Sequence, residues 1–269
     1  MNLTTFFHFS EYDFLTYKHA QSSSKDLTNF DSHAHSGYEI LYVVAGMPTY
    51  GFEENSLPLK PGDVVITPPK QYHFLQVSPN DDYERINLLL FPSQLHLNIA
   101  LDKVVLLSDN HKVLQRLLKD FSFYYKHCND EERKEIFEIK TRELIFTINH
   151  LLPNDDVSLH PTVNATLKNI LHYINANIKK NITVSDISKH CFLSEGHIFH
   201  LFSDKLNTSP MHYVKTKKML LAQSLISATD SKQAINGIAQ DLGFDDYSVF
   251  YRNYLKFFHR KPSDDLRKY

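Results

Sequence analysis

One stretch close to the C-terminus, residues 235–267, constrains the fold of this chain most strongly. Its first part places four apolar residues at the spacing of one buried helix face: Ile235, Ile238, Ala239 and Leu242. Gly243 follows and can adopt the positive φ that a tight turn between helices requires. A second helix is expected next, capped by Asp245 or Asp246. Its expected inner face comprises Val249, Phe250, Tyr254 and Phe257. Two short helices joined in this way form a helix-turn-helix, whose second helix can enter the major groove of DNA.

An earlier segment, residues 182–206, repeats this pattern. Ile187 aligns with Ile238, and Phe202 aligns with Tyr254 after one residue of slippage. The repeat predicts a second helix-turn-helix, and therefore an all-α C-terminal domain that reads DNA with two units.

A longer helix is expected to join the two units. Ser209 is a good N-cap and Pro210 a favoured first-turn residue for a helix over residues 211–227. Such a helix could hold the two recognition helices about 34 Å apart, one turn of DNA. A further amphipathic helix precedes both units, with the stripe Leu167, Ile170, Leu171 and Ile174.

The C-terminal residues resemble the signature of the AraC/XylS family of bacterial transcription regulators. The positions that match at the family's spacing are Gly243, Phe244, Ser248, Phe250, Arg252, Phe258, Pro262 and Arg267. The resemblance implies a regulator that binds double-stranded promoter DNA, as an activator more often than as a repressor, with RNA polymerase as a candidate partner. It implies no catalytic residues, so an enzyme is not expected.

We predict that both recognition helices and nearby lysines contact DNA. The predicted contacts are His197, Phe199 and His200 in the first unit, Tyr247, Ser248, Tyr251 and Arg252 in the second, and Lys217, Lys218 and Lys256 on phosphates. Arg252 suits a phosphate or a guanine edge, whereas Phe199 suits only thymine methyls or other apolar surface. Two alternatives stay open: His197 caps or packs locally, and Phe199 is a half-buried core residue.

The first unit departs from the family pattern. His200 stands where the repeat has Arg252, and residues 203–204, Ser-Asp, replace the basic pair that usually follows the helix. We therefore expect the second unit to supply more of the affinity for DNA. Asn207 and His259 stand where relatives end their recognition helices with glycine, and Asn tolerates positive φ better than His.

Length and charge fit two domains with different partners. A chain of 269 residues is long enough for two cores. The formal net charge is −2, yet residues 177–269 carry 14 basic and 9 acidic side chains, which leaves the excess acid in the other part. There is no apolar run of about 18 residues, no secretion signal, and no metal or disulfide pattern in Cys128 and Cys191. These features predict a cytoplasmic protein without a membrane segment.

Residues 1 to about 100 show short strand patterns separated by turn residues. The clearest are residues 38–45, 48–53, 63–67, 73–77 and 85–91. Strands of this length and spacing indicate a β-sandwich or barrel. Two segments resemble the cupin motifs, with His33, His35, Glu39 and Gly46 in the first and Gly62, Pro68 and His73 in the second. The resemblance implies the jelly-roll domain that many AraC-type regulators carry ahead of the DNA-binding domain.

Three imidazoles and one carboxylate are expected to point into this barrel. In a regular strand, residues 33, 35, 39, 41 and 43 share one face, which brings His33, His35 and Glu39 together. His73, from a later strand, completes three nitrogens and one oxygen, a set that suits a first-row divalent metal. In cupin enzymes the matching positions bind such a metal.

Two substitutions favour a different use of these groups. Lys70 and Val77 replace a Gly and an Asn of the second cupin motif, and regulators of this family often keep the histidines without a metal. We therefore predict no cofactor, and a pocket whose groups hydrogen-bond a polar ligand or one another.

The predicted effector pocket comprises His33, His35, Tyr38, Glu39, Tyr42 and His73. Tyrosine and histidine offer flat apolar surfaces with polar tips, which stack on a sugar ring and orient it, and Tyr50 and Tyr72 add to this set. Carbohydrate sensing is common in AraC-type regulators with a cupin domain. A sugar or another small polar molecule is therefore the expected effector.

From about residue 109 the hydrophobic period becomes helical. The two expected stripes are Val113, Leu117, Phe121 and Tyr124, and then Ile136, Ile139, Leu144, Ile148 and Leu151. They predict an antiparallel helical pair that closes the N-terminal domain, and in this family such a pair often forms the homodimer interface. The segment 153–162 is polar and Pro-rich, as a linker would be. The expected domains are therefore 1–152 and 163–269.

The sequence thus predicts an α+β chain of two domains, a cupin-like barrel with a helical pair and an all-α domain of two helix-turn-helix units. The leading interpretation is a ligand-responsive transcription regulator. Two alternatives stay open: a metal-dependent cupin enzyme fused to a DNA-binding domain, and a regulator whose cupin domain only dimerises.

Overall fold

The computed structural model describes residues 4–23, 33–53, 55–77, 82–107, 112–151 and 164–266. The chain forms two compact units, one of Met1–Asp31 with His35–Thr162, the other of Val163–Tyr269 with Ser32–Ala34. The expected linker at 153–162 and Arg267 lie outside the described residues. Within the described ranges, no helix is both long enough and apolar enough to cross a membrane.

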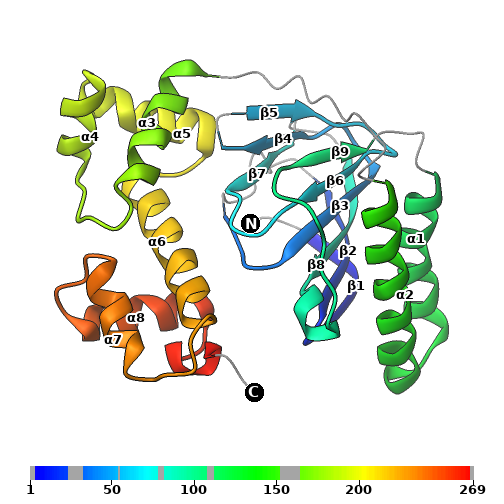
Figure 1. The fold of residues 1–269 in the computed structure, drawn as a ribbon. Helices are drawn as coiled ribbons and strands as arrows, with labels where there is room; N and C mark the ends of the chain where they lie inside the picture. The colour runs from blue at the N-terminus through cyan, green and yellow to red at the C-terminus, as the bar shows by residue number, and fades with distance from the viewer. Residues whose placement is uncertain are drawn as a thin grey trace. The chain divides into compact units, whose positions relative to one another are not determined.

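The first unit contains two antiparallel sheets (Figure 1). The larger sheet joins six strands in the order β1 (Thr4–Tyr12), β2 (Leu15–Ser23), β8 (Asp82–Leu90), β3 (Tyr38–Ala45), β6 (Val64–Thr67) and β9 (Val105–Leu107). The smaller sheet joins β5 (Asn55–Pro58), β4 (Thr49–Phe52) and β7 (His73–Gln76). The five predicted strands correspond to β3, β4, β6, β7 and β8. The predicted set lacks β1, β2, β5 and β9.

Successive residues of β3 belong to two different hydrophobic cores. Leu41 and Val43 lie in the core that contains residues of both sheets. Ile40 and Tyr42 lie in the core that the larger sheet shares with two helices. This alternation follows from the pleat of a strand, whose side chains point to opposite faces in turn.

The two helices are α1 (Lys112–His127) and α2 (Asp130–Leu151), which lie side by side against the larger sheet (Figure 1). The Asn129 side chain between them accepts hydrogen bonds from the backbone N–H groups of Glu131 and Glu132, so it caps α2. The predicted pair is confirmed, but two of its predicted inner positions are wrong. Val113 and Ile139 are 52% and 58% exposed. Other predicted positions, such as Leu117, Phe121, Leu144 and Ile148, are buried as expected. Leu114 and Phe137 are buried in addition to them.

A chain of polar side chains joins the larger sheet to α1. The Tyr17 hydroxyl lies 3.3 Å from Nδ1 of His8 and 2.8 Å from the Ser122 hydroxyl. The Ser122 hydroxyl also lies 3.1 Å from Nδ1 of His19, whose Nε2 lies 2.7 Å from a carboxylate oxygen of Glu84. Burial, followed by the charges of neighbouring basic groups, lowers the pKa of His8 to about 4.

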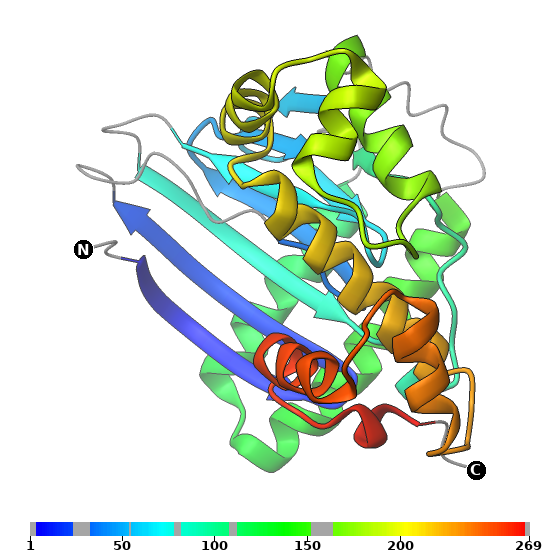
Figure 2. The same ribbon diagram turned by 90° about the vertical axis from the view of Figure 1, so that its left-hand side faces the viewer.

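The described residues of the second unit, 164–266, form six α-helices and a short 3-10 helix (Figure 2). They are α3 (Ala165–Ala176), α4 (Val184–Cys191), α5 (Glu195–Leu206), α6 (Pro210–Ile226), α7 (Ala234–Asp241), α8 (Tyr247–Phe258) and η2 (Pro262–Asp265). Helices α4 and α5 form the first helix-turn-helix and α7 and α8 the second, with α6 between them. The predicted α+β class, with a cupin-like β-rich domain and a helical DNA-binding domain, is confirmed.

Left-handed residues end the helices of both helix-turn-helix units. Gly243 has φ of +75°, and a Cβ there would lie only 3.0 Å from the Lys179 carbonyl oxygen, so both the conformation and the space favour glycine. Asn207 and His259 adopt φ of 49° and 56° at the ends of α5 and α8, the left-handed conformation that glycine adopts most easily. Phe192 adopts the same left-handed conformation at the end of α4, and its side chain is 94% exposed.

The inner face of α8 differs from the prediction at one position. Phe250 and Tyr254 are fully buried, but Val249 is 40% exposed. Asp246 is the N-cap, and its carboxylate accepts a hydrogen bond from the backbone N–H of Ser248.

Candidate functional site

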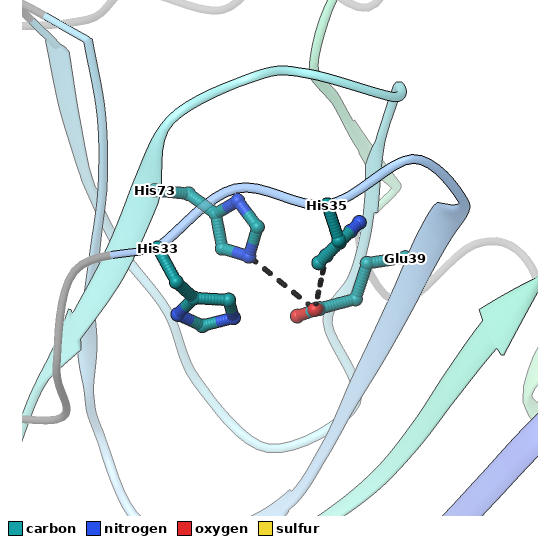
Figure 3. A group of neighbouring side chains, drawn as sticks. All are labelled: His33, His35, Glu39 and His73. Carbon is teal, nitrogen blue, oxygen red and sulfur yellow. Dashed lines mark hydrogen bonds and ion pairs between the residues drawn. The ribbon is translucent and has the colours of Figure 1, made fainter. Parts of the chain in front are cut away.

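Four side chains with metal-ligating atoms gather near the starts of β3 and β7 (Figure 3). They are His33, His35, Glu39 and His73, and one ligand atom of each lies within 4.8 Å of those of the others. His35 precedes β3, Glu39 is its second residue, and His73 is the first residue of β7. Glu39 and His73 are buried, His35 is half-buried and His33 is exposed. The structure thus brings together four of the six residues of the predicted effector pocket.

Backbone carbonyls fix the tautomer of two of these imidazoles. Nδ1 of His35 lies 2.9 Å from the carbonyl oxygen of Gly37, and Nδ1 of His73 lies 2.9 Å from that of Gln71. A carbonyl only accepts, so both Nδ1 atoms must carry the hydrogen. Both Nε2 atoms face Oε2 of Glu39, at 2.9 Å for His35 and 3.3 Å for His73. In neutral imidazoles these Nε2 atoms hold lone pairs, which a carboxylate repels. The arrangement is therefore favourable when a proton or a metal ion lies between the nitrogens and the oxygen.

The donor set fits a divalent cation as well as a polar ligand. Three imidazole nitrogens and a carboxylate oxygen match the preference of first-row metals. A histidine that donates from one ring nitrogen to a backbone carbonyl is also the usual support of a metal-ligating imidazole. With protons in place of a metal, the same groups can donate to and accept from ligand hydroxyls.

Tyr50 forms one wall beside this cluster. Its ring stacks on His73, with centroids 5.7 Å apart and 18° between the planes, and its hydroxyl is hydrogen-bonded to Thr67. Burial, followed by the charge of Glu39, raises the pKa of Tyr50 well above its ordinary value, so the phenol stays protonated. A flat, uncharged surface thus holds His73 in position.

Two predicted pocket residues, Tyr38 and Tyr42, face away from the cluster. The Tyr38 hydroxyl donates to the carbonyl oxygen of Ile99, 2.8 Å away. Tyr42 is 4% exposed and lies in the core against the helices, with Nζ of Lys119 5.7 Å from its ring centroid. Both predictions are wrong, because Tyr38 and Tyr42 are even-numbered residues of β3 and Glu39 is odd-numbered.

Lys70, which stands where the cupin motif has glycine, lies in a left-handed turn. It adopts φ of 68°, and its backbone N–H donates to the His35 carbonyl oxygen at 2.7 Å. The substitution is thus compatible with the turn that holds His35, at a cost in backbone strain.

Arg85 is a basic residue beside this core that sequence reasoning missed. It pairs in register with Val43, and its guanidinium donates to the Ser22 hydroxyl at 3.0 Å and lies 5.1 Å from the ring of Tyr83. Burial lowers its pKa. The alternation along β8 contains this information. Ile86, Leu88 and Leu90 point to the core shared with the helices, so Arg85 points to the opposite face of the sheet.

In the second unit, α8 presents basic and hydroxyl side chains to solvent. Tyr247, Ser248, Arg252 and Lys256 are exposed and Tyr251 is half-buried. Arg252 and Lys256 are the two charged residues of the helix and both are cations. This surface matches the chemistry of phosphates and base edges.

Asp265 fixes the base of α8. Its carboxylate accepts hydrogen bonds from the Tyr254 hydroxyl at 2.6 Å, from Nε of Arg260 at 3.0 Å and from Nε2 of Gln223 at 3.4 Å. The side chain is 11% exposed. One carboxylate thus ties α6, α8 and η2 together.

Helix α5 presents a different surface. Gly196, His197, Phe199 and His200 are exposed, and Phe199 is 46% exposed. The core side of the helix is formed by Ile198, Leu201, Phe202 and Leu206. Phe199 is not one of these core residues, but more than half of its surface is covered, in agreement with the half-buried alternative.

Lys218 is not available for the predicted phosphate contact. It is 6% exposed, its Nζ donates to the Leu242 carbonyl oxygen at 2.8 Å, and it lies 5.5 Å from the ring of Phe244. The ammonium caps the C-terminal carbonyl of α7, where a positive charge is favourable. Lys217, one residue earlier, is half-buried with Nζ 5.6 Å from the ring of Tyr213.

Comparison with known proteins relates both parts of the chain to transcription regulators. Residues 20–144 match the family described as an AraC-like ligand binding domain, and residues 187–268 match a helix-turn-helix domain. The lactose operon transcription activator of Staphylococcus xylosus is 28% identical over 122 residues, which are 45% of this chain and 43% of that protein. The HTH-type transcriptional regulator YdiP of Escherichia coli K12 is 21% identical over 240 residues, 86% of this chain and 78% of that one.

Among solved structures, an apo form of a ToxT variant from Vibrio cholerae aligns with 95% of this chain and 97% of its own. Its TM-score is 0.41 and its sequence identity 12%.

Proposed function

The chain belongs to the AraC/XylS family of transcription regulators, and from this membership we propose that it regulates transcription by binding promoter DNA in response to a small molecule. The observation that carries the proposal is the pair of helix-turn-helix units in one compact unit, each with an exposed recognition helix. Two units in one chain can read an asymmetric site.

The proposed DNA contacts follow from exposure. On α8 they are Tyr247, Ser248, Tyr251, Arg252 and Lys256, and on α5 they are His197, Phe199 and His200. Lys217 is a further candidate for a phosphate. We expect α8 to carry more of the salt-dependent affinity, because its cations outnumber those of α5.

The proposed effector is a sugar or another small polar molecule that binds at His33, His35, Glu39 and His73. Hydrogen-bonding groups converge there beside the flat ring of Tyr50, a combination that can orient a hydroxylated ring. The similarity to a lactose operon activator supports a sugar. Effector binding would favour one arrangement of the protein over another and so change promoter occupancy.

The tautomers of His35 and His73 support a second candidate, a metal ion in the same site. Both Nε2 lone pairs and the Glu39 carboxylate would then act as ligands, with His33 as the fourth. A bound divalent metal would supply a positive charge that attracts ligand oxygen atoms. The relatives are named as transcription regulators rather than enzymes, so we propose an effector-binding role for this site in either case.

We further propose a homodimer that forms through α1 and α2. The outer faces of these helices expose Phe123, Ile139 and Phe146 at 56%, 58% and 74%, more apolar surface than a solvated helix needs. Activation through RNA polymerase and a cytoplasmic location complete the proposal, in line with the activator names of relatives.

A thermal-shift screen of the full chain against sugars and divalent metals, with and without chelator, tests the effector site. A sugar that raises the unfolding midpoint in chelator, for the wild type and Tyr42→Phe but not for His73→Ala, supports the proposal. A shift produced only by metal favours the metal candidate. Equal shifts in wild type and His73→Ala would contradict both, and absence of selective binding to any DNA duplex would contradict the regulatory role.

A further inference from the structure

Helix α5 lacks the basic side chains with which a DNA-reading helix usually holds phosphates. Among its described residues the one Lys or Arg is Lys205, whose Nζ lies 2.9 Å from a carboxylate oxygen of Asp204. Glu195 adds a negative charge in the first turn. On α8, by contrast, Arg252 and Lys256 are exposed. Helix α5 can therefore supply little electrostatic affinity for DNA phosphates.

Helix α5 instead presents an aromatic ring, Phe199, near a position without a side chain, Gly196. Phe199 is 46% exposed, three residues after Gly196, and residues three apart lie on the same side of a helix. A Cβ built on Gly196 would meet nothing within 4 Å, so internal packing does not require glycine there. The absence of a side chain leaves one flank of the Phe199 ring uncovered by its own helix.

The major groove offers one apolar group to such a ring. Each base pair shows a distinct set of donors and acceptors there, and only thymine adds a methyl group. A phenyl ring makes no hydrogen bond, so any preference that it creates among bases must come from that methyl. His197 and His200 are also exposed on α5 and can supply polar contacts.

We propose that Phe199 is a specificity-determining residue that selects thymine, through its C5 methyl group, in the half-site read by α5. The inference rests on the proposed function, because it takes α5 to lie in the major groove. The two units then read DNA by different means: α8 with charge and hydrogen bonds, α5 with apolar contact. Base selection by α5 should accordingly depend little on salt, whereas affinity from α8 should fall steeply with it.

Replacement of thymine by deoxyuridine tests this directly, because the two bases differ only by that methyl. A duplex is first selected from a random-sequence library by the full-length protein, and each thymine in it is then replaced singly by deoxyuridine. At one or two positions we expect wild-type binding to weaken about fourfold, the worth of one buried methyl. Phe199→Ala should bind the thymine duplex about tenfold more weakly and lose its sensitivity at those same positions.

Phe192→Ala is the matched control, since it removes an even more exposed phenylalanine from the turn just before α5. It should keep the wild-type sensitivity at every thymine. Equal thymine-to-uracil ratios for wild type and Phe199→Ala at all positions would overturn the inference while leaving DNA binding intact. If no duplex is enriched at all, the proposed function fails and the inference fails with it.

Discussion

A substitution at Lys218 can distinguish a structural role in the helical unit from a direct contact with DNA. The residue is 6% exposed, and its ammonium donates to the carbonyl oxygen that ends α7, next to the turn at Gly243. Lys218→Met keeps most of the apolar stem and removes the charge and the donor. The Leu242 carbonyl then loses its partner inside a nearly closed environment.

The size of the effect follows from the hydrogen bond. Removal of a charged donor from a buried acceptor costs about 1.5–3 kcal/mol. For a domain of this size, about 2 kcal/mol lowers the unfolding midpoint by roughly 8–16 °C. DNA binding at 25 °C should stay near the wild-type level for every sequence, because a unit stable by about 5 kcal/mol or more stays about 99% folded after this loss. The dependence of log K on log salt should keep its wild-type slope, because no phosphate contact is lost.

Denaturant unfolding and fluorescence anisotropy on a labelled duplex, at several salt concentrations, measure both quantities. Lys256→Met is the control, since Lys256 is exposed on α8. It should leave stability within about 0.5 kcal/mol and reduce the slope by about 0.9. A Lys218→Met protein with unchanged stability and a slope reduced by about 0.9 would refute the reasoning and restore the phosphate role.

Three further outcomes are expected. Burial holds the pKa of His8 at about 4, below its ordinary 6.5, so the folded state favours the neutral imidazole. The resulting contribution to the free energy of unfolding is up to about 3 kcal/mol; it is present above pH 6.5 and is lost as the pH falls to 4. Urea unfolding across this pH range should therefore show that the free energy of unfolding falls less on acidification for His8→Phe than for wild type. An equal fall in both proteins would contradict this role of His8. Asp265→Ala should destabilise the second unit by about 2–4 kcal/mol, because the Tyr254 hydroxyl and two other donors lose one buried acceptor; thermal unfolding measures it, and a loss below about 0.5 kcal/mol would show that water replaces the carboxylate. Gly243→Ala should cost about 2 kcal/mol in the same assay while Gly237→Ala gains up to about 1 kcal/mol, since one has positive φ and the other stands in an open helical position; equal effects would exclude this explanation.

Periodicity predicted most of the second unit. The apolar stripes of α3 and α7, the Ser209 and Asp246 caps and the glycine turn all depend on neighbours in sequence, so a local pattern contains them. The structural role of Lys218 was not predicted, because the sequence does not indicate which carbonyl group lies near its ammonium. Its partner is brought to it by the packing of α7 on α6.

The pocket was predictable only in part, for a related reason. His33, His35, Glu39 and His73 could be grouped through the resemblance to the cupin motifs, and the structure places them together. Tyr38 and Tyr42 were assigned from residue type without regard to the phase of the strand. The polar chain from His8 to Glu84 was beyond reach, because it joins four elements whose contacts depend on the tertiary fold.

The alternation along β3 bears on how such a protein can change during evolution. Odd-numbered positions face the interior between the sheets, and even-numbered positions support the helical pair. Substitutions in the first set can therefore change the surroundings of Glu39, and with them the proposed effector site, without disturbing the second set. Insertion or deletion of one residue in β3 would exchange the two sets at once. Point substitutions in β3 are therefore compatible with this fold, whereas a change in the length of the strand is not.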